Sequence, residues 1–516
     1  MTQLNAKKQS VAPRFFPVVV VAMALLFTAT AHAAVPGITG PGFNLIAQAA
    51  FITQPDGAMV YSWGYGCDGA PAGFAPGAIS GAICSTMQIP GPTLIVTAGQ
   101  SVTVTLRNNL PAVAGNTSLL FPGFQVTAGG GVAGLLTREA APGGSVTYTF
   151  AATTPGTRAY YSGTQGDLQV EMGLYGAIVV LPAGVPAGCR AVTSTLPDGQ
   201  PDYRLAAAAY DHPETCYDRE YLFQFSEVDP KIHRQAEEVA NCVGAGGLTC
   251  PPNMNSVVTE PYHPAYFMIN GRSMPDDMDA NYVPQYPHQP YNGNPHMHPG
   301  ELVLLRVIGT GRWQHPFHEH GNHVRVLGRD GNLIVSENDS SKLAGPLLFT
   351  TTTTPGLAMD GIFYWTGKGL NWDVYGHNAA NDPGCIPDAN GYYTSNPLAP
   401  NYYEWCQDHL KALEKAPFGD VGNGGPVTLP DPTILADGPW YGGSPYLGPE
   451  ATGRAVAPTP IPPSGTVAND PGSEAGFAFM WHSHNEREIT TNNIFPGGMM
   501  MMMLVDPQAY VIREEN

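Results

Sequence analysis

The stretch TLIVTAGQSVTVTLRNNL, residues Thr93 to Leu110, decides the fold. Its second half alternates the apolar residues Val102, Val104 and Leu106 with polar neighbours, which is the two-residue period of a strand with one buried face. Between the two halves lies Gly99, a residue that tolerates the backbone angles of a tight turn. The stretch therefore predicts two short strands joined by a turn.

Segments of the same kind recur along the chain and are separated by turn residues, since the protein contains 61 glycines and 50 prolines. SVTYTFAATTPGTRAYY and LYGAIVVLP complete a first region of about 140 residues, the size of one β-sandwich. A second set starts at YFMINGR and continues with ELVLLRVIG, HVRVLGRDG, GIFYWTG, FAFMWHSH and MMMMMLVDP. Between the two sets, EYLFQFSEV is the one dense strand pattern in the connecting region. This organisation predicts an all-β fold of tandem Greek-key β-sandwiches rather than an α/β fold.

The chain begins with the pattern of a secretory signal peptide. Three basic residues precede an apolar run that ends in the small-residue sequence AHA, Ala31 to Ala33. We therefore expect residues 1–33 to be removed and the protein to be periplasmic or secreted. No later segment reaches about 18 uninterrupted apolar residues, so we expect no membrane span after signal removal.

The predicted domain organisation follows from these segments. The N-terminal sandwich is assigned to residues 34–182 and a disulfide-containing connector to residues 183–260. The C-terminal sandwich is assigned to residues 261–510, with an insertion rich in Pro and Gly at about 376–475.

Charge and cysteine content exclude several classes of protein. Lys and Arg number 23 against 42 Asp and Glu, and the net charge of −19 argues against a nucleic-acid partner. The even count of 8 cysteines suggests disulfides in an exported protein, and the absence of a CxxC pair argues against a zinc ribbon or a thioredoxin-like site. Four bridges between cysteines that are neighbours in the sequence are the simplest arrangement.

Two histidine motifs are the strongest candidates for chemistry: HPFHEHG, residues 315–321, and WHSHNERE, residues 481–488. Residues two apart on a strand share a face, so His318 pairs with His320 and His482 pairs with His484. If the two strands are neighbours, these four imidazoles converge in one pocket, while His315 and Ser483 meet in another. Such a cluster predicts a metal site, and imidazole suits copper, zinc, iron or nickel. One His-x-His motif alone is equally compatible with polar residues on a sheet.

The two motifs resemble those of multicopper oxidases. HPFHEHG is similar to the HPxHxHG motif of that family, and WHSHNERE followed by PGGM is similar to its terminal HCHxxxH…GM motif. PGPTLIVTAGQSVTVTLRNNL and GLYGAIVV resemble the opening cupredoxin domain of the family. The resemblance covers most of the chain and implies tandem cupredoxin-like sandwiches and a copper cofactor.

The sequence departs from the family pattern at the blue copper site, which the family builds from two histidines, a cysteine thiolate and an axial methionine. The resemblance implies that His315 matches the first histidine and that Met499 could stand at the axial place. Ser483 stands where the cysteine belongs, and Glu488 stands where the second histidine belongs. Because a serine hydroxyl stays protonated near neutral pH, these residues favour a hydrogen-bonded polar pocket over a hard or mixed metal site.

The first domain departs from the pattern as well. The family places four copper-ligating histidines there, but NTSLLFPGF puts Leu120 and Pro122 at two of the places, and AYYSGTQGD puts Tyr161 and Gly163 at the others. The histidines that could complete a three-copper cluster are therefore missing from this chain.

We expect an exported member of this family that binds copper, or zinc or another divalent metal, through its two C-terminal His-x-His motifs without laccase-type catalysis. One alternative is a copper-dependent oxidoreductase with a mononuclear site, or with a site completed by a heterologous partner chain. A homo-oligomer is a possible assembly, but it would not complete the site because every copy lacks the same ligands. Another is a metal-free structural or assembly subunit. A further pair, His296 and His298, could extend a metal site or bind copper at the surface, but an exposed turn is the favoured interpretation. The run Met499 to Met503 could bind soft Cu(I), but a closing strand buried on both faces explains it more simply.

Overall fold

In the computed structural model, the described residues are 35–77, 79, 81–189, 207–244, 249–369, 386–395, 402–408, 443–446, 476–508 and 510–513. The predicted signal peptide and most of the predicted insertion lie outside these residues. Within them, no helix is both long enough and apolar enough to cross a membrane.

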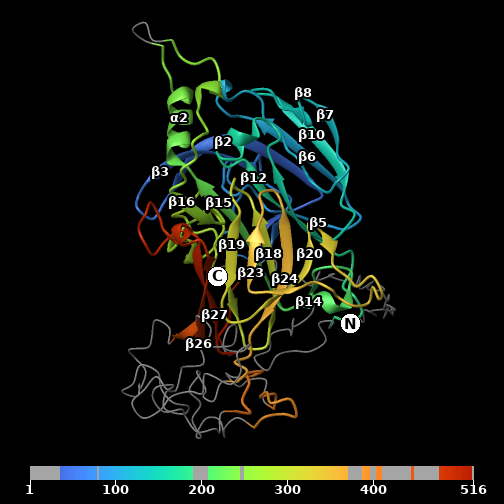
Figure 1. Ribbon diagram of the computed structural model, residues 1–516. Helices are drawn as coiled ribbons and strands as arrows, with labels where there is room; N and C mark the ends of the chain where they lie inside the picture. Colours follow the sequence, from blue (N-terminus) through green and yellow to red (C-terminus); the bar gives the residue numbers. More distant parts are fainter. Residues whose placement is uncertain are drawn as a thin grey trace, which may run out of the picture. The chain divides into compact units, whose positions relative to one another are not determined.

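The first sandwich consists of two five-stranded sheets, drawn mainly in blue and cyan in Figure 1. One sheet has the order β11 (Gly156–Tyr161), β12 (Tyr175–Leu181), β5 (Leu94–Thr97), β1 (Gly37–Thr39) and β4 (Phe74–Ala75). The other has the order β3 (Met59–Cys67), β2 (Gly42–Thr53), β6 (Ser101–Asn108), β10 (Ser145–Ala151) and β7 (Thr127–Gly130).

The two strands predicted in Thr93 to Leu110 are β5 and β6, and they belong to different sheets. Gly99, with a φ of 90°, lies in the turn that carries the chain from one sheet to the other. Val102, Val104 and Leu106 are fully buried between the sheets, as their alternation predicts. The stretch thus forms one corner of the sandwich, and each of its strands contributes to the common core.

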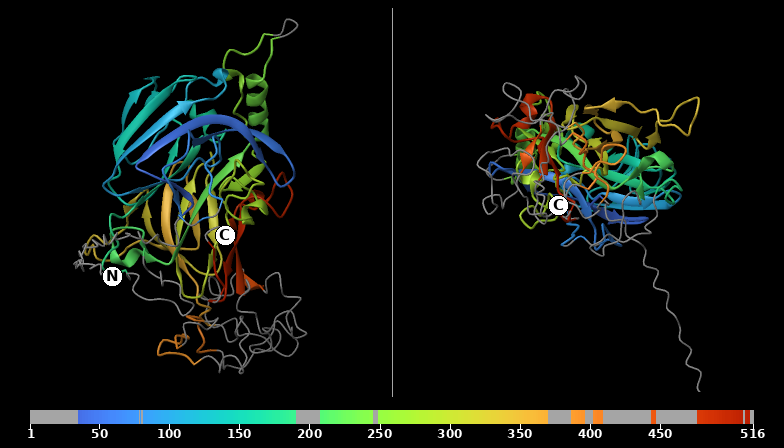
Figure 2. Two further views of the ribbon diagram at one scale, coloured as in Figure 1. Left: turned by 180° about the vertical axis from the view of Figure 1, so that it is seen from behind. Right: turned by 90° about the horizontal axis from the view of Figure 1, so that it is seen from below.

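The second sandwich has a seven-stranded and a six-stranded sheet, drawn in green to red in Figure 1 and seen from behind and below in Figure 2. The larger contains β16 (Tyr266–Ile269), β15 (Arg219–Val228), β18 (Leu302–Gly309), β24 (Ala358–Tyr364), β20 (Val324–Arg329), β21 (Asn332–Leu333) and β22 (Leu347–Leu348). The smaller contains β17 (His296–Met297), β27 (Met500–Val505), β26 (Gly476–Ser483), β19 (His315–Glu319), β23 (Thr350–Thr353) and β25 (Gly443–Tyr446).

Short elements connect the strands. The helices are α1 (Gly166–Gln169), α2 (Pro230–Ala240), η1 (Ala112–Ala114), η2 (Pro213–Thr215), η3 (Met254–Ser256), η4 (Asp276–Met278) and η6 (Glu486–Ile489). The remaining strands are β8 (Val132–Ala133), β9 (Arg138–Glu139), β13 (Ala207–Ala208) and β14 (Cys216–Tyr217). The fold is therefore all-β with tandem sandwiches, as predicted.

One strand departs from the predicted organisation. β15 lies in the range assigned to the connector, yet it pairs with β16 and, in parallel, with β18 over seven residue pairs. Its side chains are buried from Leu222 to Val228, so it is a central strand of the second sandwich. Periodicity did not show this, because a strand buried on both faces has no alternation.

Three of the four predicted disulfides are present: Cys67–Cys84, Cys189–Cys216 and Cys242–Cys250. Cys406 is also disulfide-bonded, while its expected partner, Cys385, lies outside the described residues.

Candidate metal centre

The two histidine motifs meet because their strands are neighbours. β19 and β26 are antiparallel, with His318 opposite His482 and Phe317 opposite Ser483. Directly opposite residues of an antiparallel pair share a face of the sheet. Phe317 is fully buried in the core, so the two histidines occupy the outward face.

The structure brings the rings of His318, His320, His482 and His484 together. The ring of His318 lies 4.6 Å from that of His320, 4.9 Å from that of His484 and 5.6 Å from that of His482, centroid to centroid. The ring of His482 lies 5.2 Å from that of His320 and 5.4 Å from that of His484. The side chain of His484 is 52% exposed, whereas the other three residues are buried, so the cluster opens to the surface at His484.

The nitrogen spacing is suited to one cation. One ring nitrogen from each of His318, His320 and His482 lies within 4.8 Å of the other two, and the Nε2 atoms of His320 and His482 are 3.1 Å apart. Two nitrogens that are each about 2.0–2.1 Å from one tetrahedral or square-planar ion lie roughly 2.9–3.4 Å apart. The separation of the His320 and His482 nitrogens falls in this range, so these two rings could share a metal without large movement.

Hydrogen bonds orient the rings of His318 and His482 and hold the backbone of His320. The Nδ1 atom of His318 is 2.7 Å from the hydroxyl of Thr350, and the Nδ1 atom of His482 is 2.7 Å from the carbonyl oxygen of Ser483. The indole N–H of Trp481 donates to the carbonyl oxygen of His320 at 3.0 Å. When Nδ1 donates in this way, the lone pair resides on Nε2 and the ring angle is fixed.

Burial keeps the rings of His318 and His482 neutral. Burial lowers the pKa of His318 to about 4, and the nearby rings of His482 and His484 contribute to the shift. Burial also lowers the pKa of His482, against a hydrogen bond to the backbone of Ser483 that raises it. Neutral imidazole is the form that binds a metal, so at neutral pH no proton has to be removed from these two rings.

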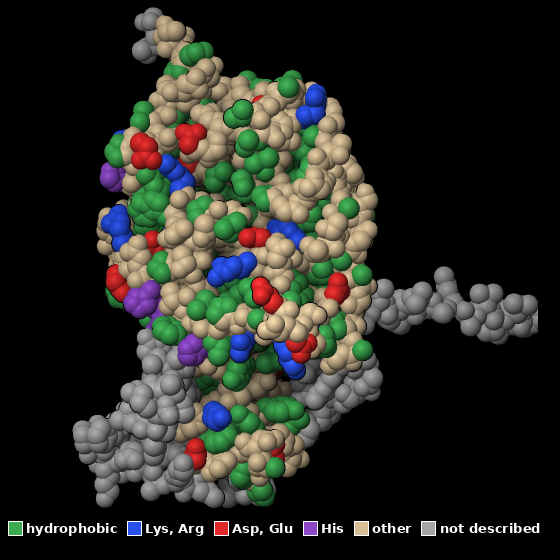
Figure 3. Space-filling model, turned by 45° about the vertical axis from the view of Figure 1, so that its right-hand side comes forward, with side chains coloured by type: hydrophobic (Ala, Val, Ile, Leu, Met, Phe, Trp, Pro, Cys, Tyr) green, Lys and Arg blue, Asp and Glu red, His purple; other side chains and the backbone are tan. Residues whose placement is uncertain are grey.

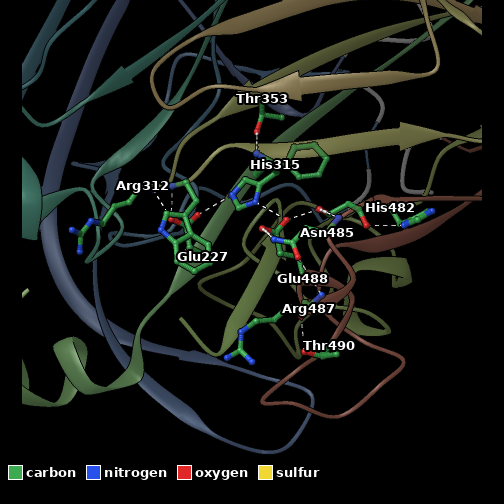
Figure 4. Close-up of polar contacts among 12 residues, drawn as sticks. Glu227, Arg312, His315, Thr353, His482, Asn485, Arg487, Glu488 and Thr490 are labelled. Carbon is green, nitrogen blue, oxygen red and sulfur yellow. Dashed lines mark hydrogen bonds and ion pairs between the residues drawn. The ribbon is translucent and has the colours of Figure 1, made fainter. Parts of the chain in front are cut away.

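His315 and Ser483 lie on the core side of the same strands and meet at Glu488. The Nδ1 atom of His315 is 2.9 Å from Oε2 of Glu488, to which the hydroxyl of Ser483 also donates. The Nε2 atom of His315 is 3.0 Å from Oε2 of Glu227, a residue of β15. Figure 4 shows the ring of His315 between the two glutamates.

Glu227 was not predicted as part of the site, since its only sequence signal is an acid within the apolar segment EYLFQFSEV. Its Oε1 accepts from the backbone N–H groups of Arg312 and Trp313 at 2.6 and 2.8 Å. The Oε1 atom of Glu488 accepts from the side-chain amide of Asn485 at 2.8 Å. Both buried carboxylates are thus hydrogen-bonded on each oxygen.

This second pocket holds a proton. Burial alone would lower the pKa of His315, but hydrogen bonds to Glu227 and Glu488 and their negative charges raise it to about 9. The two carboxylates contact opposite nitrogens of the ring, so one ion bound to His315 cannot reach both. Met499 is fully buried in the apolar core, and its carbonyl oxygen accepts from the backbone N–H of Ser483 at 3.0 Å.

The expected exposed turn at His296 and His298 is wrong. His296 is 1% exposed, and its Nδ1 atom lies 2.6 Å from the carboxylate of Asp506. His298 is also buried, with Nδ1 3.0 Å from Glu301 and Nε2 2.8 Å from the carbonyl oxygen of Tyr510. These rings attach the C-terminal segment to the sandwich, a long-range contact that local sequence does not reveal.

In the first sandwich, Leu120 and Tyr161 occupy two of the positions at which the family resemblance implies histidines. These two positions lie side by side. Leu120 and Tyr161 form an antiparallel β-bridge. A Cβ atom added at Gly163 would lie 2.8 Å from the side chain of Leu120, so apolar atoms fill this space.

The fold and the site define a protein of tandem cupredoxin-like sandwiches that carries a histidine cluster on two neighbouring strands of the second sandwich. Residues 77–184 and 258–357 each match a family model described as multicopper oxidase. The chain belongs to the multicopper oxidase family, for which copper is the implied cofactor. No curated protein matches it.

Solved structures show weak similarity. A blue copper oxidase from Nitrosomonas europaea is 15% identical over 90% of this chain and 85% of its own, with a TM-score of 0.43. The multicopper oxidase mgLAC is 15% identical over 92% and 88%, with a TM-score of 0.43. A copper nitrite reductase from Nitrosomonas europaea is 16% identical over 64% and 86%, with a TM-score of 0.37.

Proposed function

We propose that this protein binds copper through His318, His320, His482 and His484 and does not carry out laccase-type catalysis. The observation that carries the proposal is the convergence of ring nitrogens from His318, His320 and His482 within 4.8 Å of one another. Two oriented and neutral imidazoles at this cluster support it, because they form a nitrogen donor set of the kind that copper prefers.

The remainder of the family's redox machinery lacks its ligands. A blue copper centre needs a thiolate to accept electrons from a substrate. In this chain Ser483 donates to Glu488, and His315 is held by two carboxylates. Copper at the histidine cluster would supply a redox-active Lewis acid. The protein's own residues hold the rings in place, and His315 holds a proton in the neighbouring pocket.

We further propose that residues 1–33 direct export, so that the protein acts in the periplasm or outside the cell. A second candidate function is a copper-dependent oxidoreductase whose site another chain completes, and the half-exposed ring of His484 favours it. A homo-oligomer would not supply histidines at positions 120, 122, 161 and 163, so the partner would be a different protein. The third candidate, a metal-free subunit, predicts no specific uptake.

The experiment compares the mature protein with the double variant His318→Ala/His482→Ala after loading with Cu(II) or Zn(II) and removal of loosely bound metal. We expect stoichiometric copper in the wild type and loss of specific uptake in the variant. The visible spectrum of the loaded protein should lack the intense thiolate-to-copper band.

The control is His263→Ala, which removes an exposed imidazole and should leave uptake unchanged. Copper retained by the double variant, or uptake of zinc alone by the wild type, would contradict the proposal. Oxygen consumption with phenols, Fe(II), Mn(II) or Cu(I) tests the second candidate directly.

A further inference from the structure

The run of methionines at the end of the chain divides between the two faces of β27. In the antiparallel pair β26–β27, Trp481 lies opposite Met501, and Phe479 lies opposite Met503. All four are fully buried in the core, so the expected closing strand accounts for these methionines.

The alternate positions lie on the other face, the one that carries the histidine cluster. His482 lies opposite Met500, and Met480 lies opposite Met502. Met480 and Met502 are half-buried, so the expectation that both faces of this strand are buried is wrong at Met502. Because side chains directly opposite in a pair have Cβ atoms about 4.5–5.5 Å apart, these thioethers form a row next to His482.

Met278, on η4, is not part of this row. Its Sδ atom accepts from the backbone N–H of Met502 at 3.4 Å, and its side chain packs against the core cluster that contains Met501 and Met503.

We propose that Met480, Met500 and Met502, a set we call the methionine row, bind Cu(I) beside the histidine cluster. Soft thioether ligands select Cu(I), whereas imidazole also accepts harder ions. Packing does not require methionine at a half-buried position, where the β-branched residues favoured in strands would serve. The methionine row extends the proposed copper binding to Cu(I). It is a separate site, because its ligands do not include the four histidines.

The test measures Cu(I) affinity without oxygen, by competition with a chromophoric Cu(I) chelator. Met480→Leu/Met500→Leu/Met502→Leu removes three sulfurs at nearly constant volume. Loss of a partner outside the coordination sphere already costs about 10–100-fold in metal affinity, so loss of three ligands should weaken Cu(I) binding by more than about 100-fold. X-ray absorption of the wild-type Cu(I) complex should show sulfur ligands.

The matched control is Met501→Leu/Met503→Leu, which makes the same change on the core face of the same strand and should leave Cu(I) affinity unchanged. If the triple variant does not fold, Met502→Leu against Met503→Leu makes the same comparison. Unchanged affinity in the outward-face variant, or absence of sulfur from the spectrum, would overturn the proposal.

His318→Ala/His482→Ala separates this inference from the proposed function. Cu(I) binding should persist in that variant while Cu(II) uptake is lost. A wild type that binds Cu(I) through sulfur but takes up no Cu(II) would overturn the proposed function and leave the methionine row intact. Loss of Cu(I) binding in the histidine variant would instead show that the row is not a site of its own.

Discussion

Ser483 contacts residues of both pockets, although its side chain is not one of the proposed metal ligands. Its side chain points to the core side of β26 and donates to Glu488. Its carbonyl oxygen faces the Nδ1 atom of His482, a ring of the outward cluster. One residue therefore couples the orientation of the histidine cluster to the buried charges around His315.

Replacing Ser483 by cysteine should not by itself create a blue copper centre. Glu227 and Glu488 would still hold His315 through both of its nitrogens, so the ring could not bind a metal. We expect no intense visible absorption when Ser483→Cys is loaded with Cu(II). The triple variant Ser483→Cys/Glu488→His/Glu227→Gln, which removes both carboxylates and adds an imidazole, is the comparison. An intense blue colour in the single variant would show that the hydrogen bonds to His315 yield to copper.

Helix α2 docks on the first sandwich through a buried acid. Glu171, in the turn after α1, accepts from the backbone N–H of Asp229, the residue that caps α2, at 2.7 Å. The hydroxyl of Tyr262 lies 2.7 Å from the other oxygen of Glu171 and 3.2 Å from Glu227. Burial raises the pKa of Glu171 to about 8, so this carboxyl is protonated at neutral pH.

Glu171→Gln tests this protonation, because glutamine mimics the protonated acid. The folded-state pKa of Glu171 lies above its ordinary value of 4.5, so its contribution to stability is complete below that value and is lost as the pH rises through about 8. Glu171 alone should lower the free energy of unfolding of the wild type by up to roughly 1.4 kcal/mol per pH unit over this range.

Between about pH 5 and 6.5, urea unfolding should show that Glu171→Gln lacks this falling contribution, so its slope differs from that of the wild type. The lowered pKa of His318, about 4, adds a contribution that rises with pH over this window in both proteins alike. This window precedes the contribution of His315, whose raised pKa of about 9 lies above its ordinary 6.5 and reduces stability only at higher pH, in both proteins alike. Identical pH profiles for the two proteins would mean that Glu171 is ionised when buried.

The two sandwiches are held together by a buried polar network. Asp360, on β24, accepts from the backbone N–H and the hydroxyl of Thr157, on β11, and from the hydroxyl of Tyr210. Arg306, on β18, is fully buried and contacts Glu220 at 2.7 Å and Asp360 at 3.4 Å. Charged side chains from several strands neutralise one another at this interface. Removing one of them therefore leaves another buried charge without its partner.

Asp360→Ala should be strongly destabilising because it leaves the guanidinium of Arg306 with one carboxylate and removes the acceptor for Thr157. We expect a loss of about 3–5 kcal/mol, the usual cost of breaking a buried ion pair by removing one partner. Calorimetry should show the sandwiches unfolding in a less cooperative transition. Asp339→Asn, in an exposed turn, is the control and should keep the wild-type melting temperature. A single unshifted transition in Asp360→Ala would argue against the network.

On the face shown in Figure 3, the described Lys and Arg side chains lie singly among acidic and apolar ones. Basic charge on this face is therefore dispersed rather than gathered into one patch.

The local sequence pattern was sufficient to predict the strands and to predict which residues share a face of a strand. Alternation in Thr93 to Leu110 predicted β5 and β6, and the spacing of His318 with His320 and of His482 with His484 predicted two pairs. These properties depend on the two-residue repeat of a strand, which is written in neighbouring residues. Only the pairing of distant strands placed His318 opposite His482, Met480 opposite Met502, and Glu227 against His315. Register and burial arise from packing between segments far apart in the chain, and no local repeat encodes them.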